Sequence, residues 1–481
     1  MLEDIISDRL KKLKNFEAAG VLPYPEKSSR THTTLQVLEN FDSFNSNPTT
    51  ITGRLTGFRD QGGVFFADIT DESGKLQIVG KKDNFENFEL YQKNLDIGDF
   101  IEATGTTFIT KKGEKSLEIK NLKLLTKSLR PLPDQWSGLE DIEIKLRQRY
   151  LDVLTDPAVK AIFYKKAKFW DVIRNTLKER GFLELEMPVL EPIPGGAEAE
   201  PFITHHNALD TDFYLRISLE LPLKKALIAG YEKVFEIGRI FRNEGIDAEH
   251  LQDYTQCEFY EAYSNYEELM TFVEGLYKKI VIAVTGEETT TLKDQTINWS
   301  GSWPRVTYKE IFEKYVGLDL DSTSEADLLK KAKAEKLNPE KGIGRGRLID
   351  LLYKKLARPN IIQPTFLINP PVELEPLAKI KVDEPSKVCR MQVIACGTEL
   401  GKGFSELNDP VDQRARFEAQ MKLREKGDKE AQMLDDEFLT ALEFGMPPAS
   451  GFGLSERLFA ILINRPIRET VFFPPMKPKG K

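Results

Sequence analysis

The sequence predicts an α+β protein with a small N-terminal β-barrel and a larger domain in which helices flank a mostly antiparallel sheet. Two observations support this class. Five short segments with period-two alternation lie between about residues 49 and 125, separated by Gly- and Asp-rich turns. After a proline-containing linker, helical and strand-like patterns follow in the order helix, strands, helices, strands, which is typical of an α+β domain.

The composition is that of a globular protein. Apolar residues make up 40% of the 481 residues and charged residues 30%, which is enough apolar material for sizeable cores. No apolar run approaches the roughly 18 to 20 residues that a membrane-spanning helix needs. The N-terminus lacks the apolar block of a signal peptide. We therefore expect a cytoplasmic protein that does not enter a membrane.

The net charge and the metal-binding residue types limit which nucleic acids and metal ions the protein could bind. The net charge of -8 counts weakly against a general nucleic-acid coat, but it is compatible with a protein that reads one RNA locally. The cysteines Cys257, Cys389 and Cys396 have no CxxC spacing, so neither a disulfide framework nor a zinc ribbon is expected. The four histidines are too scattered for a histidine-based metal site. Carboxylates would therefore hold any divalent ion, which favours magnesium.

The first part of the chain reads as one helix followed by a barrel. Residues 2–19 form an amphipathic helical pattern that ends at Gly20 and Pro23. The predicted strands begin at about residue 49 and continue through GVFFADIT (63–70), KLQIVG (75–80), DFIEATGTTFI (99–109) and SLEIKNLKLL (116–125). An OB-fold fits this series, and so does a generic small barrel. KSLRPLPDQWSG (127–138) is a linker, so we assign 1–138 to the first domain and 139–481 to the second.

The second part begins with a long helix. Residues 158–180 place apolar side chains on one helical face before Gly181: Val159, Ile162, Phe163, Trp170, Ile173 and Leu177. The predicted strands or loops are FLELEMPVL (182–190), KVFEIGRIF (233–241), DYTQCEFYEAY (253–263), QPTFLINPP (363–371), VCRMQVIACG (388–397) and GFSEL (403–407). Residues 305–360 and 410–427 read as helical.

The segment FRNEGIDAEHLQDYTQCEFYEAY (241–263) carries the first candidate site. On a strand, alternate residues share a face. One face would line a pocket with Tyr254, Gln256, Glu258 and Tyr260, while Thr255, Cys257 and Phe259 would pack on helices. On the preceding strand, Glu236, Gly238, Ile240 and Arg242 share a face by the same rule.

These side chains suit a small, charged and planar ligand. Arg242 at a strand end can bind a phosphate or carboxylate with two hydrogen bonds. His250 can contact phosphate, Tyr254 can stack on a base, and Glu258 faces a cation or a donor. The alternative is a solvated hairpin with salt bridges.

A second candidate segment lies near the C-terminus. SGFGLSERLFAIL (450–462) places glycines immediately before an amphipathic helix, with Arg457 near its start. Glycine allows a ligand to approach the backbone closely. A tight strand-to-helix connection is the alternative for this segment alone.

Together these segments resemble the signature motifs of class II aminoacyl-tRNA synthetases. The pattern FRNEG…H…YT..E resembles motif 2, GFGLSERL resembles motif 3, and residues 158–188 resemble motif 1, which in the family forms the dimer interface. Residues 124–152, 193–221 and 403–420 are similar to lysyl-tRNA synthetases of the bacterial type. The resemblance extends from about residue 1 to the end of the chain.

The resemblance implies a reaction and its partners. L-Lysine and ATP would form lysyl-adenylate and pyrophosphate, and the lysyl group would then pass to the 3′-terminal ribose of tRNA-Lys. The implied substrates and cofactor are lysine, ATP and Mg²⁺, and the implied assembly is a homodimer. The chemistry is an in-line attack of a carboxylate on the α-phosphate, in which the protein mainly positions reactants and neutralises charge.

The resemblance also implies roles for single residues at the nucleotide. Arg242 should hold the α-phosphate and the substrate carboxylate, Glu244 should lie near the adenine amino group, and His250 near the outer phosphates. Tyr254 and Arg457 should stack on the two faces of the base. Arg242, Arg457 and the metal ligand Glu399 are the implied catalytic residues.

Further implied roles concern lysine and RNA. Gly196 and Glu220 should contact the α-amino group, and Arg242 the carboxylate. Glu258, Tyr260 and Glu406 should receive the ε-ammonium, with Phe404 on the methylene chain. In the barrel, Phe66 and Gln77 match anticodon-contacting positions, and an aromatic ring stacked on a splayed base suits OB-fold recognition of RNA. As alternatives, Phe66 could belong to the barrel core and Glu220 to a salt bridge. We expect His205 and His206 to be structural.

Three departures from the family pattern stand out. Leu251 and Gln252 replace the usual Asn-Pro pair after the motif 2 histidine, and motif 3 is one residue short. At the metal site, Gln392 stands seven residues before Glu399, where the family has a second carboxylate, and Lys402 replaces the usual asparagine.

The third departure makes the pocket two charge units less negative than the family pattern, so we expect weaker Mg²⁺ binding. We hypothesise that Lys402 partly substitutes for a metal ion. Alternatively, Lys402 points to solvent and Gln392 coordinates through its carbonyl oxygen. Glu399 and Glu406 also differ in strand parity, so the chain must bend, and Gly401 and Gly403 would permit this.

Three other functions are alternatives for a chain with these motifs. An aspartyl- or asparaginyl-tRNA synthetase is disfavoured because Glu258 and Glu406 would repel an anionic side chain. A protein lysyl-ligase of the same catalytic fold normally lacks the N-terminal barrel. A non-catalytic tRNA-binding paralogue should have lost Arg242, Glu399 or Arg457, and all three are present.

Overall fold

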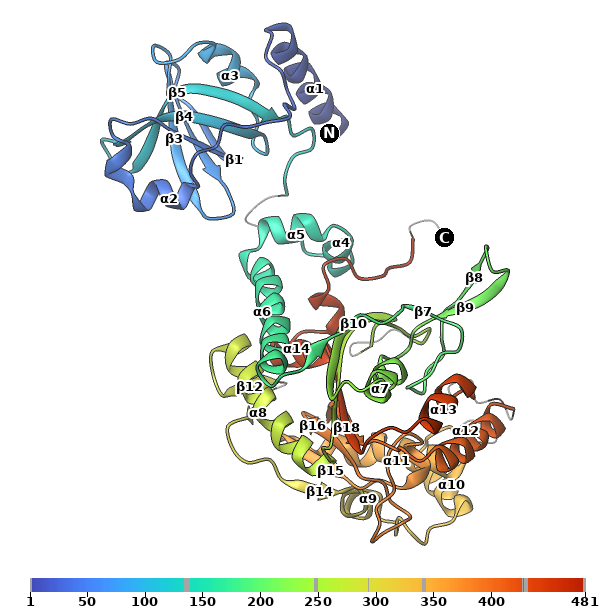
Figure 1. The fold of residues 1–481 in the computed structure, drawn as a ribbon. Helices are drawn as coiled ribbons and strands as arrows, with labels where there is room; N and C mark the ends of the chain where they lie inside the picture. Colours follow the sequence, from blue (N-terminus) through green and yellow to red (C-terminus); the bar gives the residue numbers. More distant parts are fainter. Residues whose placement is uncertain are drawn as a thin grey trace. The chain divides into compact units, whose positions relative to one another are not determined.

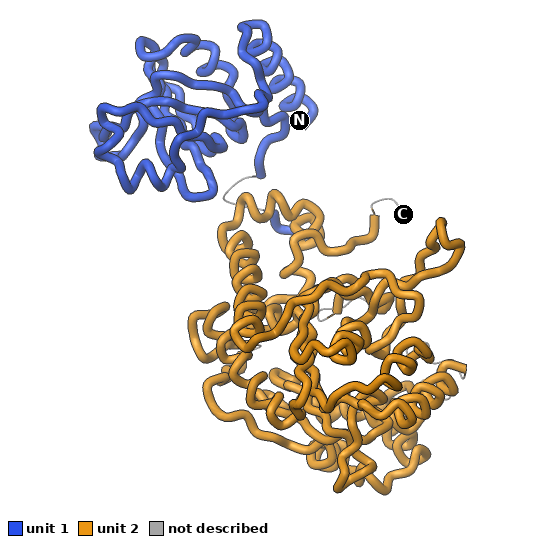
Figure 2. Tube along the Cα trace, in the orientation of Figure 1, with its two compact units in different colours: residues 1–141 blue, residues 142–481 orange. Residues whose placement is uncertain are grey.

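The computed structural model describes residues 2–133, 139–245, 250–292, 294–339, 343–425, 427 and 431–478. The chain forms two compact units, residues 1–141 and 142–481 (Figure 2). The predicted domain boundary at residue 138 lies in the linker segment 134–138, outside the described residues. Within the described parts of the chain, no helix is both long enough and apolar enough to cross a membrane.

The first unit is a closed five-stranded barrel, as predicted (Figure 1). Its strands are β1 (Thr49–Asp60), β2 (Val64–Thr70), β3 (Lys75–Lys81), β4 (Phe100–Ile109) and β5 (Lys115–Thr126), and they pair in the order β1-β2-β3-β5-β4. Alternate residues of each strand fill the interior, so Phe65, Ile69 and Ile78 are fully buried. Helices α1 (Leu2–Ala18), α2 (Thr34–Glu39) and α3 (Phe88–Asn94) complete the unit.

The second unit is built on an eight-stranded sheet. The order along the sheet is β14 (Arg305–Thr307), β15 (Thr365–Ile368), β16 (Arg390–Ala395), β17 (Thr398–Ser405), β18 (Ala449–Ser455), β11 (Asp253–Ala262), β10 (Lys233–Phe241) and β6 (Leu183–Glu184). The central pairs are antiparallel, and only the outer pairs β14–β15 and β10–β6 are parallel. The predicted α+β class with a mostly antiparallel sheet is confirmed.

Helices cover both faces of this sheet (Figure 1). Helices α6 (Pro157–Glu179) and α8 (Tyr266–Thr285) pack on one face against Cys257, Phe259 and Phe452. Helices α7 (Glu220–Ile228), α12 (Pro410–Glu425) and α13 (Asp436–Glu443) pack on the other, against Tyr260 and Phe404. The odd-numbered residues of β11 therefore face α6 and α8, and its even-numbered residues face the opposite side of the sheet, as the strand pattern predicted.

Helix α6 begins and ends where the sequence predicts. Asp156 caps it by accepting the backbone N–H of Ala158 at 2.8 Å, Pro157 follows at the first helical position, and Gly181 has a φ of +88° just beyond the end. Ile173 and Leu177 are fully buried, and Phe169, which the predicted face omits, is buried with them.

A β-bulge resolves the parity difference between Glu399 and Glu406. The register of β16 on β17 shifts at Val393/Ile394, which leaves Leu400 without a partner and brings Glu399 onto the face of Lys402 and Phe404. The expected bend is therefore a bulge, and Gly401 and Gly403 follow it in the chain. They provide room on the opposite face, where a Cβ at Gly401 would collide with the ring of Phe452.

The predicted strand 182–190 is much shorter than expected. Only β6 pairs with β10, and Leu190–Glu191 (β7) pairs with β9 (Thr211–Leu215). Between them, the backbone N–H of Met187 donates to the Glu236 carboxylate at 2.9 Å instead of to a strand, and Pro188 cannot donate. These two residues therefore interrupt the predicted strand between β6 and β7.

The remaining elements lie around the sheet. They are α4 (Ile142–Arg147), α5 (Arg149–Thr155), β8 (Ile203–His206), β12 (Thr289–Leu292), β13 (Gln295–Asn298), α9 (Tyr308–Val316), α10 (Glu325–Ala334), α11 (Arg345–Leu352) and α14 (Arg457–Leu462). The predicted helical regions 305–360 and 410–427 are confirmed in outline. Helices α7 and α8 were not predicted.

Candidate active site

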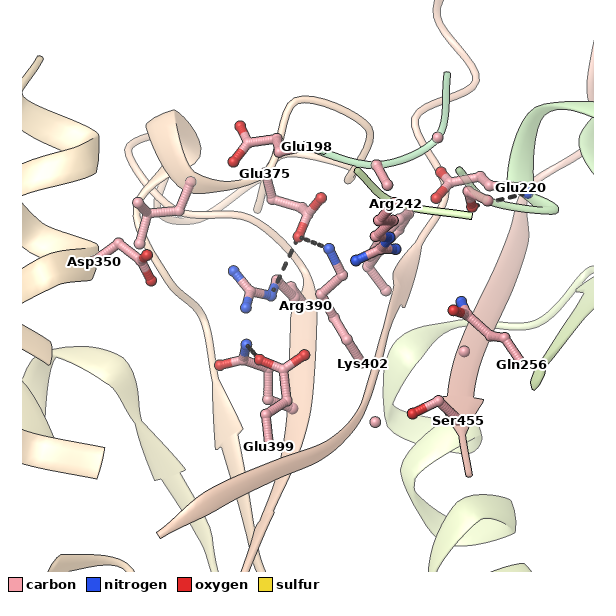
Figure 3. A pocket seen from close by; sticks show the side chains of 18 of the residues that line it. Glu198, Glu220, Arg242, Gln256, Asp350, Glu375, Arg390, Glu399, Lys402 and Ser455 are labelled. Carbon is pink, nitrogen blue, oxygen red and sulfur yellow. Dashed lines mark hydrogen bonds and ion pairs between the residues drawn. The ribbon is translucent and has the colours of Figure 1, made fainter. Parts of the chain in front are cut away.

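A cavity of about 470 Å³ opens on the face of the sheet that carries the even-numbered residues of β11 (Figure 3). Most of the site residues expected from the sequence line it, although they are distant in the chain. They are Gly196, Glu220, Arg242, Glu244, His250, Tyr254, Glu258, Tyr260, Gln392, Glu399, Phe404 and Arg457. Glu406 does not line the cavity, and Phe66 and Gln77 belong to the other unit.

Arg242 lies just beyond the end of β10 and points into the cavity (Figure 3). Its Nε and Nη2 donate to the carbonyl of Ile217 at 3.3 and 3.2 Å, and its guanidinium carbon lies 5.7 Å from the centre of the Tyr254 ring. The carbonyl and the ring hold this arginine before any ligand binds. Residues 246–249 of the following loop are outside the described residues.

Leu251 and Gln252, which replace the usual Asn-Pro pair after His250, fix the position of the chain just before β11. Leu251 is buried against Ala460 and Ile467, so it ties the loop to α14 and the segment after it. Gln252 accepts the backbone N–H of Arg242 at 2.8 Å through its carbonyl and donates its amide to the carbonyl of Glu244 at 3.0 Å. The departure from the family pattern is therefore accommodated by apolar packing and local hydrogen bonds.

Glu258 is a buried carboxylate surrounded by neutral donors. Its Oε1 accepts from Ser218 Oγ at 2.8 Å, the backbone N–H of Leu219 at 2.9 Å and Gln256 Nε2 at 2.8 Å. Its Oε2 accepts from the Tyr260 hydroxyl at 2.8 Å. Such donors stabilise an ionised carboxylate without cancelling its charge. The wall of the cavity therefore carries a negative charge beside Tyr260.

Behind this wall lies a second group of charges. Lys224 contacts Glu220 Oε1 at 2.5 Å and also pairs with Glu406 Oε2, and all three side chains are almost completely buried. Burial raises the pKa of Glu220 to about 7, although Lys224 opposes the rise. Burial likewise raises the pKa of Glu406 well above its ordinary value. Gly196, with a φ of +84°, lies so close that a Cβ there would be 2.9 Å from Ser218 Oγ.

A third charged group surrounds Glu399 (Figure 3). Gln392 Nε2 donates to Glu399 Oε2 at 2.6 Å. Lys402 Nζ lies 2.9 Å from Glu375 Oε2, and Arg390 Nε lies 3.4 Å from the same oxygen. Burial alone would raise the pKa of Glu399, but Arg390, Lys402 and Arg457 outweigh it and hold the pKa below its ordinary value.

Motif 3 places Arg457 at the first position of α14, against this group. Its Nη1 donates to the backbone carbonyl of Glu399 at 3.4 Å. The preceding residue, Glu456, is fully buried, pairs with Lys166 on α6 and accepts the backbone N–H of Thr255 at 3.2 Å. These contacts fix the shortened connection between β18 and α14. At Gly451, a Cβ would clash with the Tyr260 ring, so this glycine makes room for a neighbouring side chain.

In the barrel, Phe66 lies outside the core. The core position is taken by its neighbour Phe65, whereas Phe66 is partly exposed and pairs across the strands with Arg59 and Val79. Gln77 is on the same outer face, where its Oε1 accepts from Ser116 Oγ at 3.0 Å. The two side chains form part of one outward surface of β2 and β3.

The two adjacent histidines lie on the β8–β9 hairpin and do not line the cavity. His205 Nδ1 is 3.0 Å from Asp212 Oδ1, and His206 packs against the Phe213 ring. Their contacts are those of structural residues.

Sequence reasoning missed several charged residues at or behind the cavity, among them Lys224, Glu375 and Arg390. Lys224 follows Glu220 by four residues, so a helix prediction at 220–228 would have placed both on one face. No comparable signal marks Glu375 or Arg390, because only the folded sheet brings them to Lys402.

The mostly antiparallel eight-stranded sheet, the arginines at the end of β10 and the start of α14, and the five-stranded barrel define a class II tRNA synthetase architecture with an appended nucleic-acid-binding unit. Residues 141–477 match the family of class II tRNA synthetases for D, K and N, and residues 49–125 match the OB-fold nucleic acid binding domain. The first of these matches covers well over half of the chain.

Curated relatives show to which branch of the class II tRNA synthetases the chain is most similar among D, K and N. The chain is 44% identical to the lysine–tRNA ligase of Moorella thermoacetica, over 99% of this chain and 98% of the relative. It is 42% identical to those of Thermoanaerobacter sp. (100% and 97%) and Roseiflexus castenholzii (99% of each). The chain belongs to the lysine–tRNA ligase family of class II tRNA synthetases.

Proposed function

We propose that this chain activates L-lysine with ATP to form lysyl-adenylate and pyrophosphate, and then transfers the lysyl group to the 3′ end of tRNA-Lys. One observation carries the choice of amino acid. Three buried carboxylates, Glu220, Glu258 and Glu406, gather around Tyr260, and the buried ammonium of Lys224 pairs with two of them. A buried surplus of negative charge favours a cationic ligand and disfavours aspartate.

The proposed reaction uses positioning and charge neutralisation. Arg242 would bind the lysine carboxylate and the α-phosphate, so that the attacking oxygen and the phosphorus meet in line. Tyr254 and Arg457 would enclose the adenine, with Glu244 at its amino group and His250 at the outer phosphates. Glu220 and Gly196 would take the α-amino group, Glu258 and Tyr260 would take the ε-ammonium, and Phe404 would take the methylene chain. Glu406 would add its charge from behind the wall of the cavity.

Aminoacylation with labelled amino acids tests this proposal. With tRNA-Lys, the chain should accept lysine and reject aspartate and asparagine. With tRNA-Asp or tRNA-Asn, no amino acid should be transferred. Efficient charging with aspartate or asparagine would instead assign the chain to another branch of the same class.

Synthetases of this family use ATP, generally with a metal ion, and we propose Mg²⁺ for this chain. Among the described residues, no three Asp, Glu, His or Cys side chains gather as a metal cage. Glu399 offers one carboxylate, and Gln392, whose Nε2 donates to Glu399 Oε2 at 2.6 Å, carries an amide oxygen as a second donor atom. This donor set fits an ion that arrives with ATP, because Mg²⁺ is often bound through one or two carboxylates plus phosphates. The ion would neutralise phosphate charge.

We expect Lys402→Ala to increase the magnesium requirement of ATP–pyrophosphate exchange. Lys402 brings a fixed positive charge to the cavity and pairs with Glu375, whose charge would otherwise repel the triphosphate. The half-saturating Mg²⁺ concentration should rise about threefold or more, which corresponds to about 0.7 kcal/mol at 1.4 kcal/mol per tenfold change. Lys381→Ala, which removes a surface lysine paired with Asp383, is the control. An unchanged magnesium titration would reject the idea that Lys402 partly replaces a metal ion.

We also propose that residues 1–138 bind the anticodon arm and residues 139–481 carry catalysis. The outward position of Phe66 and Gln77 on β2 and β3 supports this assignment, because an exposed aromatic ring on a barrel can stack on a splayed base.

Phe66→Ala is expected to weaken aminoacylation of tRNA while leaving lysyl-adenylate formation nearly intact. The lost stacking corresponds to about 1 to 3 kcal/mol per base, and it should raise KM for tRNA. The comparison variant is Phe65→Ala, whose buried ring should make it cost about 3 to 5 kcal/mol of barrel stability instead. If adenylate formation falls as much as aminoacylation in Phe66→Ala, the ring has a structural role.

The proposed assembly is a cytoplasmic homodimer formed through residues 158–188. Large apolar side chains in and next to this segment are exposed, among them Tyr164, Leu183 and Leu190. Burial of such side chains is typical of a stable dimer interface. Light scattering after size exclusion should give twice the mass of 54.8 kDa. A monomer at micromolar concentration would reject the dimer.

A further inference from the structure

The charges behind the cavity wall contain a lysine of the protein itself. Lys224 has no exposed side-chain surface, and it stands on α7 one helical turn after Glu220. Its ammonium contacts Glu220 Oε1 at 2.5 Å, pairs with Glu406 Oε2, and lies 5.4 Å from the centre of the Phe404 ring. All three partners are residues that the proposed function assigns to the lysine substrate.

Lys224 nevertheless cannot touch a ligand directly, because it does not line the cavity. Glu406 shares this position behind the wall, and its Oε1 has no hydrogen-bond partner in the described structure. A Cβ on Gly451 would lie 2.5 Å from that oxygen, so β18 packs closely against it. Lys224 is therefore the group that fixes the position of Glu406 from the side away from the cavity.

The number of charges in this group matches the proposed substrate. Glu220, Glu258 and Glu406 supply three negative charges when ionised, and Lys224 supplies one positive charge. When all three carboxylates are ionised, two negative charges remain for the two ammonium groups that lysine carries. Its carboxylate would face Arg242.

Two buried carboxylates this close need a common cation. Without it, one of them would keep a proton or turn away, because an uncompensated buried charge is costly. Burial lowers the pKa of Lys224, but the two carboxylates outweigh this effect and hold the pKa of Lys224 above its ordinary value. The three groups therefore form one unit.

We propose that Lys224 is a positioning residue for substrate recognition: its buried ammonium ties Glu220 to Glu406 and leaves the pocket with two negative charges for the two ammonium groups of lysine. This inference rests on the proposed lysine specificity. Lys224 acts through Glu406, so its contribution to lysine binding should disappear when Glu406 is made neutral.

The test is a double-mutant cycle with Lys224→Met and Glu406→Gln, measured by ATP–pyrophosphate exchange and by calorimetric titration of lysine. Lys224→Met should raise KM and Kd for lysine at least about tenfold, with KM for ATP changed by less than about twofold. The next residue on the helix provides the control: Lys225 is partly exposed, 3.9 Å from Glu437, and Lys225→Met should behave like the unmodified chain.

The cycle separates positioning from a general loss of stability. In the Glu406→Gln background, Lys224→Met should add less than about threefold to KM for lysine, because residues that act through each other are not additive. If Lys224→Met alone does not fold, the comparison of Glu406→Gln with the double variant still decides the question.

Three results would overturn the proposal: an unchanged or lower KM for lysine in Lys224→Met, an equal loss for lysine and ATP, or additive losses in the double variant. Failure of the proposed function is a different result, because then the unmodified chain would show no lysine-dependent exchange.

Discussion

Arg242→Ala is expected to lower kcat/KM for ATP–pyrophosphate exchange by about 10²- to 10³-fold, the usual loss when one preorganised donor to a developing charge is removed. Arg242 is held in advance by the carbonyl of Ile217 and the ring of Tyr254, so little reorganisation is needed when the reactants arrive. The loss should appear in kcat and in both substrate KM values, because this side chain is proposed to contact the carboxylate and the α-phosphate together.

Arg239→Ala provides a matched control. Arg239 lies on β10, three residues before Arg242, but its side chain is partly exposed and pairs with Asp253 at 2.5 Å. Its removal should change the exchange rate by less than about threefold, as is usual for exposed ion pairs. If the two variants lose activity equally, Arg242 supports the hairpin and does not contact the reactants.

Glu406→Gln is expected to lower kcat/KM for lysine at least about tenfold, with a much smaller effect on KM for ATP. The amide has nearly the same shape but no charge, and loss of one partner from a buried charge pair costs about 2 to 5 kcal/mol. Initial rates of exchange at varied lysine and varied ATP separate the two substrates.

Glu437→Gln is the control for this variant. Glu437 is exposed, and it lies 3.9 Å from Lys225, the residue that follows Lys224 on α7. It should leave both KM values unchanged. Equal losses for lysine and ATP in Glu406→Gln would mean that Glu406 supports the fold of the whole site and does not select lysine.

Local patterns were enough to predict the two faces of β11. Period-two alternation puts Tyr254, Gln256, Glu258 and Tyr260 on the cavity and Cys257 and Phe259 on the helices, and the structure has this arrangement. The barrel strands and helix α6 follow from similar local signals. Helix α8 was not predicted, although Asn265 provides a clear N-cap with Glu268 as its partner.

Non-local features could not be predicted in the same way. The bulge at Leu400 depends on how β16 and β17 pair, and neither sequence alone contains this information. The pairing of Lys402 and Arg390 with Glu375 also requires the folded sheet, since Glu375 lies outside the regular elements. Glu406 was expected at the cavity, but the ammonium of Lys224 holds it behind the wall.

The central claim is that a surplus of buried negative charge selects lysine. It is tested most directly by ATP–pyrophosphate exchange with each of the twenty amino acids on the unmodified chain. Lysine alone should support rapid exchange, and aspartate and asparagine should give background rates. Exchange with aspartate or asparagine at a rate comparable to that with lysine, or no exchange with any amino acid, would contradict it.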